Sequence, residues 1–133
     1  MQRLFPPTLA LLLLAGCQSK QIDNSMIVDP GPSVGFAADV QPIFNRGCGG
    51  FGCHVGETTN GINLSTYADV MASVGFQYSG PTVVAGDADA SPLVDKISPN
   101  PSQGSRMPLG AAPLSASDIA LIRQWIDDGA EDN

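Results

Sequence analysis

The sequence predicts an all-α fold, a small bundle of about three to five short helices joined by long loops. Three observations predict it. Apolar residues recur at helical spacing in several short segments, capping residues mark the ends of those segments, and no apolar–polar alternation lasts long enough to make a sheet. A chain of 133 residues holds one hydrophobic core and has no room for a second.

We expect residues 1–16 to be a secretory signal peptide that is removed from the mature protein. Arg3 supplies a positive charge, and residues 9–14 form an apolar run too short to span a bilayer, which takes about 20 residues. The run ends in Leu-Ala-Gly-Cys at positions 14–17, which resembles a bacterial lipobox. Lipid modification of Cys17 is therefore expected. The alternative is a plain signal peptide with an incidental cysteine.

Residues 17–34 are polar and are interrupted by proline and glycine at positions 30–32. This composition favours a flexible tether over an ordered arm packed on the domain. Residues 35–133 then form the domain. Gln18, rather than Asp, follows Cys17, and this resembles bacterial lipoproteins that are sorted to the outer membrane. The expected location is the bacterial cell envelope, with the lipid on Cys17 in the membrane and the domain on its periplasmic or surface face.

The chain is acidic, with 13 Asp and Glu against 6 Lys and Arg and a net charge of −7. Loss of Arg3 with the signal peptide makes the mature protein more negative still. An acidic chain without a basic stripe disfavours nucleic-acid binding. It suits partner proteins that carry basic patches. No feature of the sequence indicates the oligomeric state.

The first helix is expected to end at Gly47, immediately before a cysteine. Asp39 is a candidate N-cap, which would place Pro42 in the first turn, where its missing N–H costs little. If the helix begins earlier, Pro42 should kink it. The apolar residues of the segment share one helical face: Phe36, Val40, Ile43 and Phe44.

Two shorter helices are expected in the middle of the chain. Thr66 and Asp69 resemble a capping box at the start of a helix that ends near Gly75. Ser91 and Pro92 are typical of an N-cap followed by the first helical position. The apolar face of the earlier helix contains Tyr67, Val70, Met71 and Val74.

The last helix has the clearest signals at both ends. Ser115 and Asp118 form a pattern like a capping box, and Leu114 can pack against Ile119 as a hydrophobic staple. Gly129 is the expected C-terminal cap. Five apolar residues share one arc of this helix: Ile119, Leu121, Ile122, Trp125 and Ile126.

A seven-residue stretch from Cys48 to His54 contains the only histidine of the chain and two of its three cysteines. Its sequence is Cys-Gly-Gly-Phe-Gly-Cys-His. The pattern Cys-x-x-Cys-His is typical of covalent haem attachment, in which both thiols bond to the porphyrin and the His ligates the iron. Here four residues separate Cys48 and Cys53, and three of the four are glycine, which lets the backbone bulge and approach a flat ligand.

Three interpretations of this stretch remain open at the level of the residues. The first is a covalent haem with His54 as the proximal ligand. The second is a disulfide or redox thiol pair formed by Cys48 and Cys53, which leaves the adjacent His54 unexplained. The third is a metal site, which needs about four ligands where the sequence offers no second Cys or His pair.

Haem iron in electron carriers commonly takes a Met thioether opposite the His. Met26 lies in the tether, and Met71 lies on a helix face, where Met usually fills the core. Met107 lies in an irregular loop that can present its sulfur freely, so it is the expected distal ligand; the alternative is a gap-filling side chain. Arg106 is a candidate for pairing with a haem propionate, and a solvated surface role is the alternative.

The order of these short motifs resembles that of class I c-type cytochromes, and it is most similar to single-haem domains of planctomycete and other environmental bacterial lipoproteins. The resemblance covers approximately residues 36–130. Besides Cys48 to His54, it rests on four further groups of residues, which are Asp-Val-Gln-Pro-Ile-Phe at 39–44, Gly-Asp at 86–87 with Ser-Pro-Leu at 91–93, Met-Pro at 107–108, and Leu-Ser at 114–115 with Trp-Ile-x-x-Gly-Ala at 125–130.

The resemblance implies a cytochrome c-like bundle around one haem c. It implies Cys48 and Cys53 as thioether attachment points, His54 as the proximal iron ligand and Met107 as the distal ligand. The four-residue spacer departs from the family's pattern. A buried macrocycle would also enlarge the small apolar core that such short helices provide.

The resemblance further implies that the first and last helices cross, with Phe44 and Trp125 near the contact. The expected function is extracytoplasmic electron transfer without enzymatic turnover, since both iron positions are filled. One alternative is a small structural or binding lipoprotein with a Cys48–Cys53 disulfide and no haem. Another keeps the haem but makes Met107 labile, as in a peroxidase-like enzyme or a ligand sensor.

Overall fold

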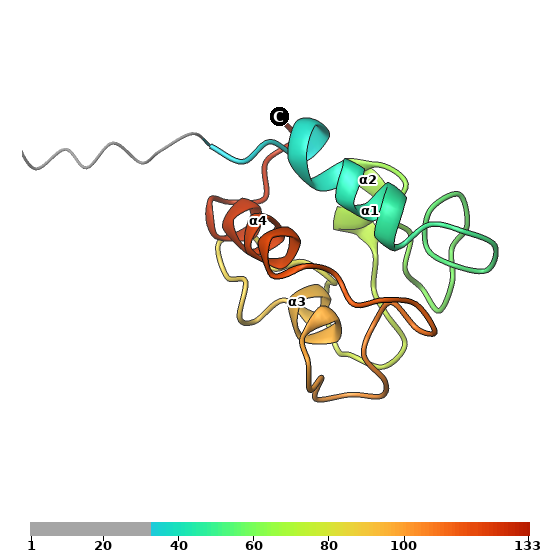
Figure 1. Ribbon diagram of the computed structural model, residues 1–133. Coiled ribbons are helices and arrows are strands. Elements are labelled where there is room, and N and C mark those ends of the chain that lie inside the picture. Colours follow the sequence, from blue (N-terminus) through green and yellow to red (C-terminus); the bar gives the residue numbers. More distant parts are fainter. Residues whose placement is uncertain (1–32) are drawn as a thin grey trace, which may run out of the picture.

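The computed structural model describes residues 33–133, and these residues form helices and loops without a strand (Figure 1). The all-α prediction is confirmed. One π-helical turn and four α-helices follow along the chain: η1 (Phe36–Val40), α1 (Gln41–Gly47), α2 (Tyr67–Ala72), α3 (Pro92–Ile97) and α4 (Ala116–Asp127). The predicted signal peptide, Cys17 and nearly all of the tether lie outside the described residues. Within residues 33–133, every helix is too short or too polar to cross a membrane.

Pro42 shapes the first helical element, which begins earlier than an Asp39 cap would allow. The backbone N–H groups of Val40 and Gln41 each donate to the carbonyl five residues earlier. Pro42 has no N–H, and its ring disfavours a regular turn before it, so a wide turn precedes α1. Asp39 does not cap α1. Its carboxylate accepts the Gly35 N–H at 2.8 Å, at the start of η1.

The start of α2 is the predicted capping pair. Thr66 Oγ1 accepts the Asp69 N–H at 3.2 Å and donates to the Asp69 carboxylate at 2.7 Å. The helix ends at Ala72, before the expected Gly75, because Ser73 is extended (φ −68°, ψ 132°). The Ser73 hydroxyl is buried and donates to the Asp69 carbonyl at 2.8 Å.

The start of α3 matches the predicted Ser-Pro pair, although the serine side chain has another role. Pro92 is the first residue of α3, and Ser91 precedes it. The Ser91 hydroxyl is fully buried, accepts the Val84 N–H at 2.9 Å and donates to the Asp87 carbonyl at 2.8 Å. It therefore ties the loop before α3 to the helix start instead of capping the helix.

Both predicted caps of α4 are present. Ser115 Oγ accepts the Asp118 N–H at 3.0 Å. At the other end Gly129 has a φ of 112°, and the Ala130 N–H donates to the Trp125 carbonyl at 2.8 Å. With the Gly129 N–H bonded one turn back, this is the Schellman arrangement that ends a helix at a left-handed glycine.

An aromatic cluster joins the first and last helical elements, and η1 packs against α4. Phe36 lies between Trp125 (ring centroids 5.2 Å apart) and Tyr67 (5.4 Å), and Phe44 packs on its edge at 6.3 Å. Phe36 of η1 therefore makes the ring contact with α4, where we expected Phe44. The Trp125 Nε1–H is satisfied by the Glu131 carbonyl at 2.9 Å, so the indole is buried without loss of a hydrogen bond.

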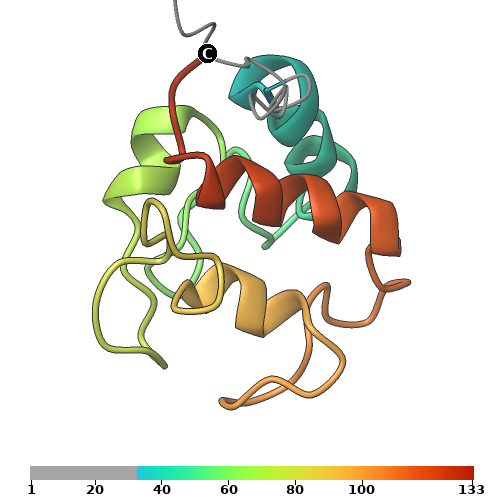
Figure 2. The same ribbon diagram turned by 90° about the vertical axis from the view of Figure 1, so that its left-hand side faces the viewer.

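Helix α4 lies between η1 and α3, as both views show (Figures 1 and 2). Three long loops, residues 48–66, 73–91 and 98–115, connect these helices. The first and the last of them are the loops of the predicted haem ligands. They carry the motif around Cys48 and His54 and the loop around Met107. The helices thus form the apolar core, and the loops approach each other beside it.

Candidate functional site

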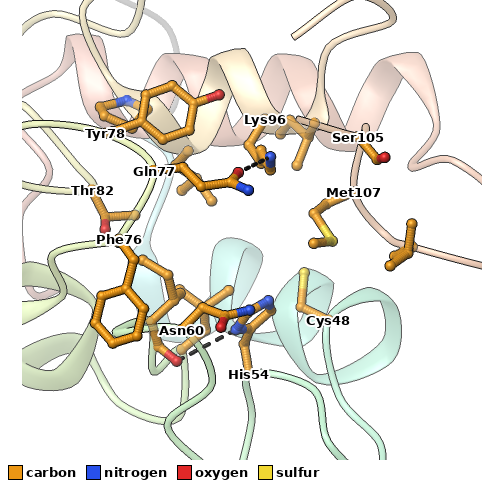
Figure 3. Close-up of a pocket in the computed structure, with 17 residues that line it drawn as sticks. Cys48, His54, Asn60, Phe76, Gln77, Tyr78, Thr82, Lys96, Ser105 and Met107 are labelled. Carbon is orange, nitrogen blue, oxygen red and sulfur yellow. Dashed lines mark hydrogen bonds between the residues drawn. The ribbon is translucent and has the colours of Figure 1, made fainter. Parts of the chain in front are cut away.

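The structure contains a cavity of about 270 Å³ between the three long loops and helix α3. Cys48, His54 and Met107, which are far apart in the sequence, all line it. Met107 extends from its own loop toward Cys48 and His54 (Figure 3). The fold therefore brings together three of the five side chains that we expected at the haem.

His54 is held by the loop that follows it. Its Nδ1 lies 3.4 Å from the Ile62 carbonyl oxygen. A carbonyl only accepts, so Nδ1 is the donor in this contact, and in the neutral ring Nε2 then has the free lone pair. The His54 carbonyl accepts the Leu64 N–H at 2.6 Å, which closes the loop around the ring. This tautomer and anchoring are what a ring needs to ligate a metal through Nε2.

Cys48 is a half-buried thiol at the end of α1 and packs against the hydrophobic core. Burial, with a smaller contribution from Cys53, raises the pKa of Cys48 to about 11. The thiol is therefore protonated at neutral pH and is a poor nucleophile for disulfide exchange. Both Cys48 and Cys53 are free thiols, and the structure does not favour the disulfide alternative.

Cys53 is placed differently from Cys48. Cys53 is half-exposed, and its Sγ lies 3.9 Å from the Phe51 carbonyl oxygen. Cys53 does not line the cavity. Thr59 Oγ1 donates to the Cys53 carbonyl at 2.6 Å and so holds the backbone before His54. Within the motif, Cys48 and His54 reach the cavity and Cys53 lies outside it.

The glycines of the spacer are required by its conformation. Gly50 and Gly52 have φ values of 119° and 72°, in the region that favours glycine. A Cβ on Gly49 would lie 2.7 Å from the Asn45 carbonyl oxygen, so a side chain cannot fit against α1 there. The predicted bulge is present, and it leaves Phe51 fully exposed at its tip.

The loop after α3 places Met107 but directs Arg106 elsewhere. The Met107 N–H donates to the Lys96 carbonyl at 2.9 Å, which ties the loop to α3. Arg106 is not among the residues that line the cavity, and its Nε–H donates to the Ile97 carbonyl at 2.9 Å. Met71 packs against the core, as expected of a helical Met.

Sequence reasoning missed the polar part of the cavity wall, which contains Gln77, Tyr78, Thr82 and Lys96. No motif marks these residues. The single available signal is that Lys96 is the one cation between Arg46 and Arg106. Their convergence depends on how the 73–91 loop meets α3, which is a tertiary feature.

Two apolar side chains of the cavity wall are largely exposed to solvent. Phe76 and Leu109 line the cavity and remain 81% and 69% exposed.

No cluster of three or more His, Cys, Asp or Glu side chains suited to a metal ion occurs in residues 33–133. The third interpretation of the motif, a metal site built from protein ligands alone, thus has no support in this part of the chain.

Comparison with known proteins places few constraints on this chain. No family model and no curated protein sequence matches it. Among solved structures, Kuenenia stuttgartiensis hydrazine synthase is similar at 20% identity and a TM-score of 0.49. The match covers 73% of this chain and 16% of that one. The functional interpretation therefore rests on the site.

Proposed function

We propose that this protein is an extracytoplasmic electron carrier that binds one haem c, with His54 and Met107 as the axial iron ligands. One observation carries the proposal. The only imidazole of the chain and a loop methionine line the same cavity, together with the first thiol of a Cys…Cys-His motif. The resemblance to class I c-type cytochromes points to the same residues.

The donor set and the cavity suit a haem. His54 is fixed in the tautomer that frees Nε2, and Met107 is held on a loop tied to α3. Apolar side chains, among them Leu64, Leu93 and Ile97, form much of the wall. A bound haem supplies reversible one-electron chemistry at its iron, and the protein contributes the ligands and the apolar surroundings that raise its potential.

Covalent attachment is assigned to Cys48 and Cys53. Cys48 already faces the cavity, and its neutral thiol is the form present before attachment. Cys53 lies outside the cavity, at the end of a glycine-rich bulge. Rotation of this bulge is the local change that would bring the second thiol to the ring edge.

The cellular role follows from the expected lipid on Cys17 and from the charge. A carrier anchored in the bacterial envelope, at the outer membrane, would meet partner proteins in solution or at the same membrane. A net charge of −7 favours redox partners with basic patches and weak, short-lived encounters. With both axial positions filled, the haem passes electrons and does not turn over a substrate.

Expression of the full chain in a host with haem-attachment machinery tests the proposal. We expect red protein with sharp reduced-state bands, and a mass that exceeds the processed chain by one haem and survives denaturation. His54→Ala is expected to abolish iron ligation by imidazole, with Arg123→Ala as a surface control. Colourless wild-type protein with the bare chain mass would refute the proposal.

A further inference from the structure

Among the Lys, Arg, Asp and Glu side chains of residues 33–133, only Lys96 lines the cavity, and it is a cation in a chain with a large acidic excess. Its Nζ donates to the Gln77 side-chain oxygen at 2.6 Å and to the Gln103 carbonyl at 2.6 Å. It also lies over the Tyr78 ring, 5.8 Å from the centroid. An ammonium has three N–H donors, so one remains beyond these two neutral acceptors.

No carboxylate neutralises Lys96 in the described part of the chain. Residues 33–133 form two ion pairs, Arg46–Asp118 and Arg123–Asp89, and neither includes Lys96. The adjacent Asp95 forms no ion pair with Lys96, and the Lys96 charge is the smallest of the influences that lower the pKa of the Asp95 carboxyl. Its carboxylate accepts the Tyr78 hydroxyl at 2.6 Å and the Ser102 N–H at 2.9 Å, and the Tyr78 hydrogen bond lowers the pKa of Asp95.

The loop that covers Lys96 packs closely against it at Gly104. A Cβ on Gly104 would lie 2.9 Å from Gln77 Oε1 and 3.0 Å from Lys96 Nζ. Gly104 also has a φ of 61°, which favours glycine. Gln77 and Lys96 are thereby held together at one end of the cavity, on the side away from His54 (Figure 3).

Thr82 provides a second, independent observation in the same cavity. Its side chain is 4% exposed, and Oγ1 is buried without a hydrogen-bond partner in residues 33–133. An unsatisfied buried hydroxyl costs about 1–3 kcal/mol. Thr82 lines the cavity, so a rotation about χ1 that turns the buried Oγ1 toward it would give its O–H a partner in the bound group.

We propose that this end of the cavity is a carboxylate-binding subsite, with Lys96 as its charged group and Thr82 as a hydroxyl donor. The inference rests on the proposed function, because the carboxylates of a haem are its two propionates. It assigns the ionic contact to Lys96, where the sequence suggested Arg106. An ammonium with a free donor and no acidic partner gains most from an anion in a partly desolvated site.

The reduction potential of the holoprotein measures this contact. An uncompensated propionate favours the ferric iron, which carries one more positive charge than the ferrous iron. Lys96→Gln removes the compensating charge and is expected to lower the midpoint potential in a spectroelectrochemical titration. Lys96→Arg keeps the charge and is expected to keep the midpoint potential close to that of the wild type. Arg123→Gln removes one positive charge far from the cavity and is the matched control.

Each outcome decides between the alternatives. If Lys96→Gln shifts the potential no more than Arg123→Gln does, Lys96 does not hold a propionate. Loss of holoprotein in Lys96→Gln but not in Lys96→Arg supports the charged contact, and loss in both shows a purely structural role. Thr82→Val is expected to lower the unfolding midpoint of the holoprotein, and an unchanged or higher midpoint removes Thr82 from the subsite. Colourless wild-type protein would instead refute the proposed function itself.

Discussion

The Nδ1 atom of His54 lies 3.4 Å from the carbonyl oxygen of Ile62, eight residues further along the chain. This contact selects the tautomer in which Nε2 is free, and it fixes the ring at the edge of the cavity. The local loop thus prepares the imidazole for a ligand before any ligand is bound. Met107 reaches the same cavity from a different loop.

Substitution of Met107 tests the distal ligand. Met107→Ala is expected to abolish the methionine-to-iron charge-transfer band of the oxidised holoprotein and to lower its reduction potential, because the thioether raises the potential. Met71→Ala is the matched control, since Met71 packs against the core and should leave the band intact. A band that survives in Met107→Ala would exclude Met107 as the ligand.

Single cysteine substitutions test the attachment. Cys48→Ala and Cys53→Ala are each expected to leave one thioether, so that haem still remains with the denatured chain, while the double variant releases it. Mass spectrometry of the denatured protein measures the bound haem. If Cys53→Ala leaves the number of thioethers unchanged, attachment occurs through Cys48 alone.

The aromatic cluster predicts a large stability effect. Trp125 is 1% exposed and its ring centroid lies 5.2 Å from that of Phe36, so Trp125→Ala should reduce the free energy of unfolding by about 3–5 kcal/mol. Phe51 is fully exposed, and Phe51→Ala should change the free energy of unfolding by less than about 0.5 kcal/mol. Denaturant unfolding followed by tryptophan fluorescence measures Phe51→Ala, and circular dichroism measures Trp125→Ala. Similar losses in both variants would contradict the packing described here.

Two glycines that flank the first helical element, Gly49 after α1 and Gly35 before η1, should differ in how well they tolerate alanine. A Cβ at Gly49 would lie 2.7 Å from the Asn45 carbonyl oxygen, so Gly49→Ala should displace Cys48 and cost about 1–3 kcal/mol. Gly35 has a φ of −88° and room for a Cβ, with its nearest atom at 3.4 Å, so Gly35→Ala should be tolerated. Thermal unfolding and the yield of attached haem distinguish the two. Equal yields and midpoints would show that α1 adjusts freely.

The buried thiol predicts a pH dependence for the haem-free chain. The folded state raises the pKa of Cys48 from 9.0 to about 11, so its neutral form is favoured on folding. This contribution to stability is fully present below about pH 9 and is lost as the pH rises through about 11. Alkylation of Cys48 should accordingly be slow near neutral pH and accelerate toward pH 11. A rate that is already at its plateau at pH 9 would contradict the raised pKa.

Local signals in the sequence were sufficient for the starts of α2, α3 and α4, but not for the first helix, which Asp39 does not cap. Thr66 and Ser115 cap their helices as predicted, because capping depends on residues a few positions apart, and Ser91 precedes α3 without capping it. The ends were less predictable. Helix α2 ends before Gly75, and the turn before Pro42 is π-helical. These details depend on where Ser73 and the Phe36 ring are buried.

The sequence by itself determined the all-α class, the caps of the helices and the chemical identity of the candidate ligands, since these depend on residue type and short spacing. Only the tertiary structure decided which residues share the cavity. It brought Met107 to His54, left Cys53 and Arg106 outside, and added Lys96 and Thr82. The physical reason is that such contacts join loops far apart in the sequence, and their approach is set by how the helices bury Phe36 and Trp125.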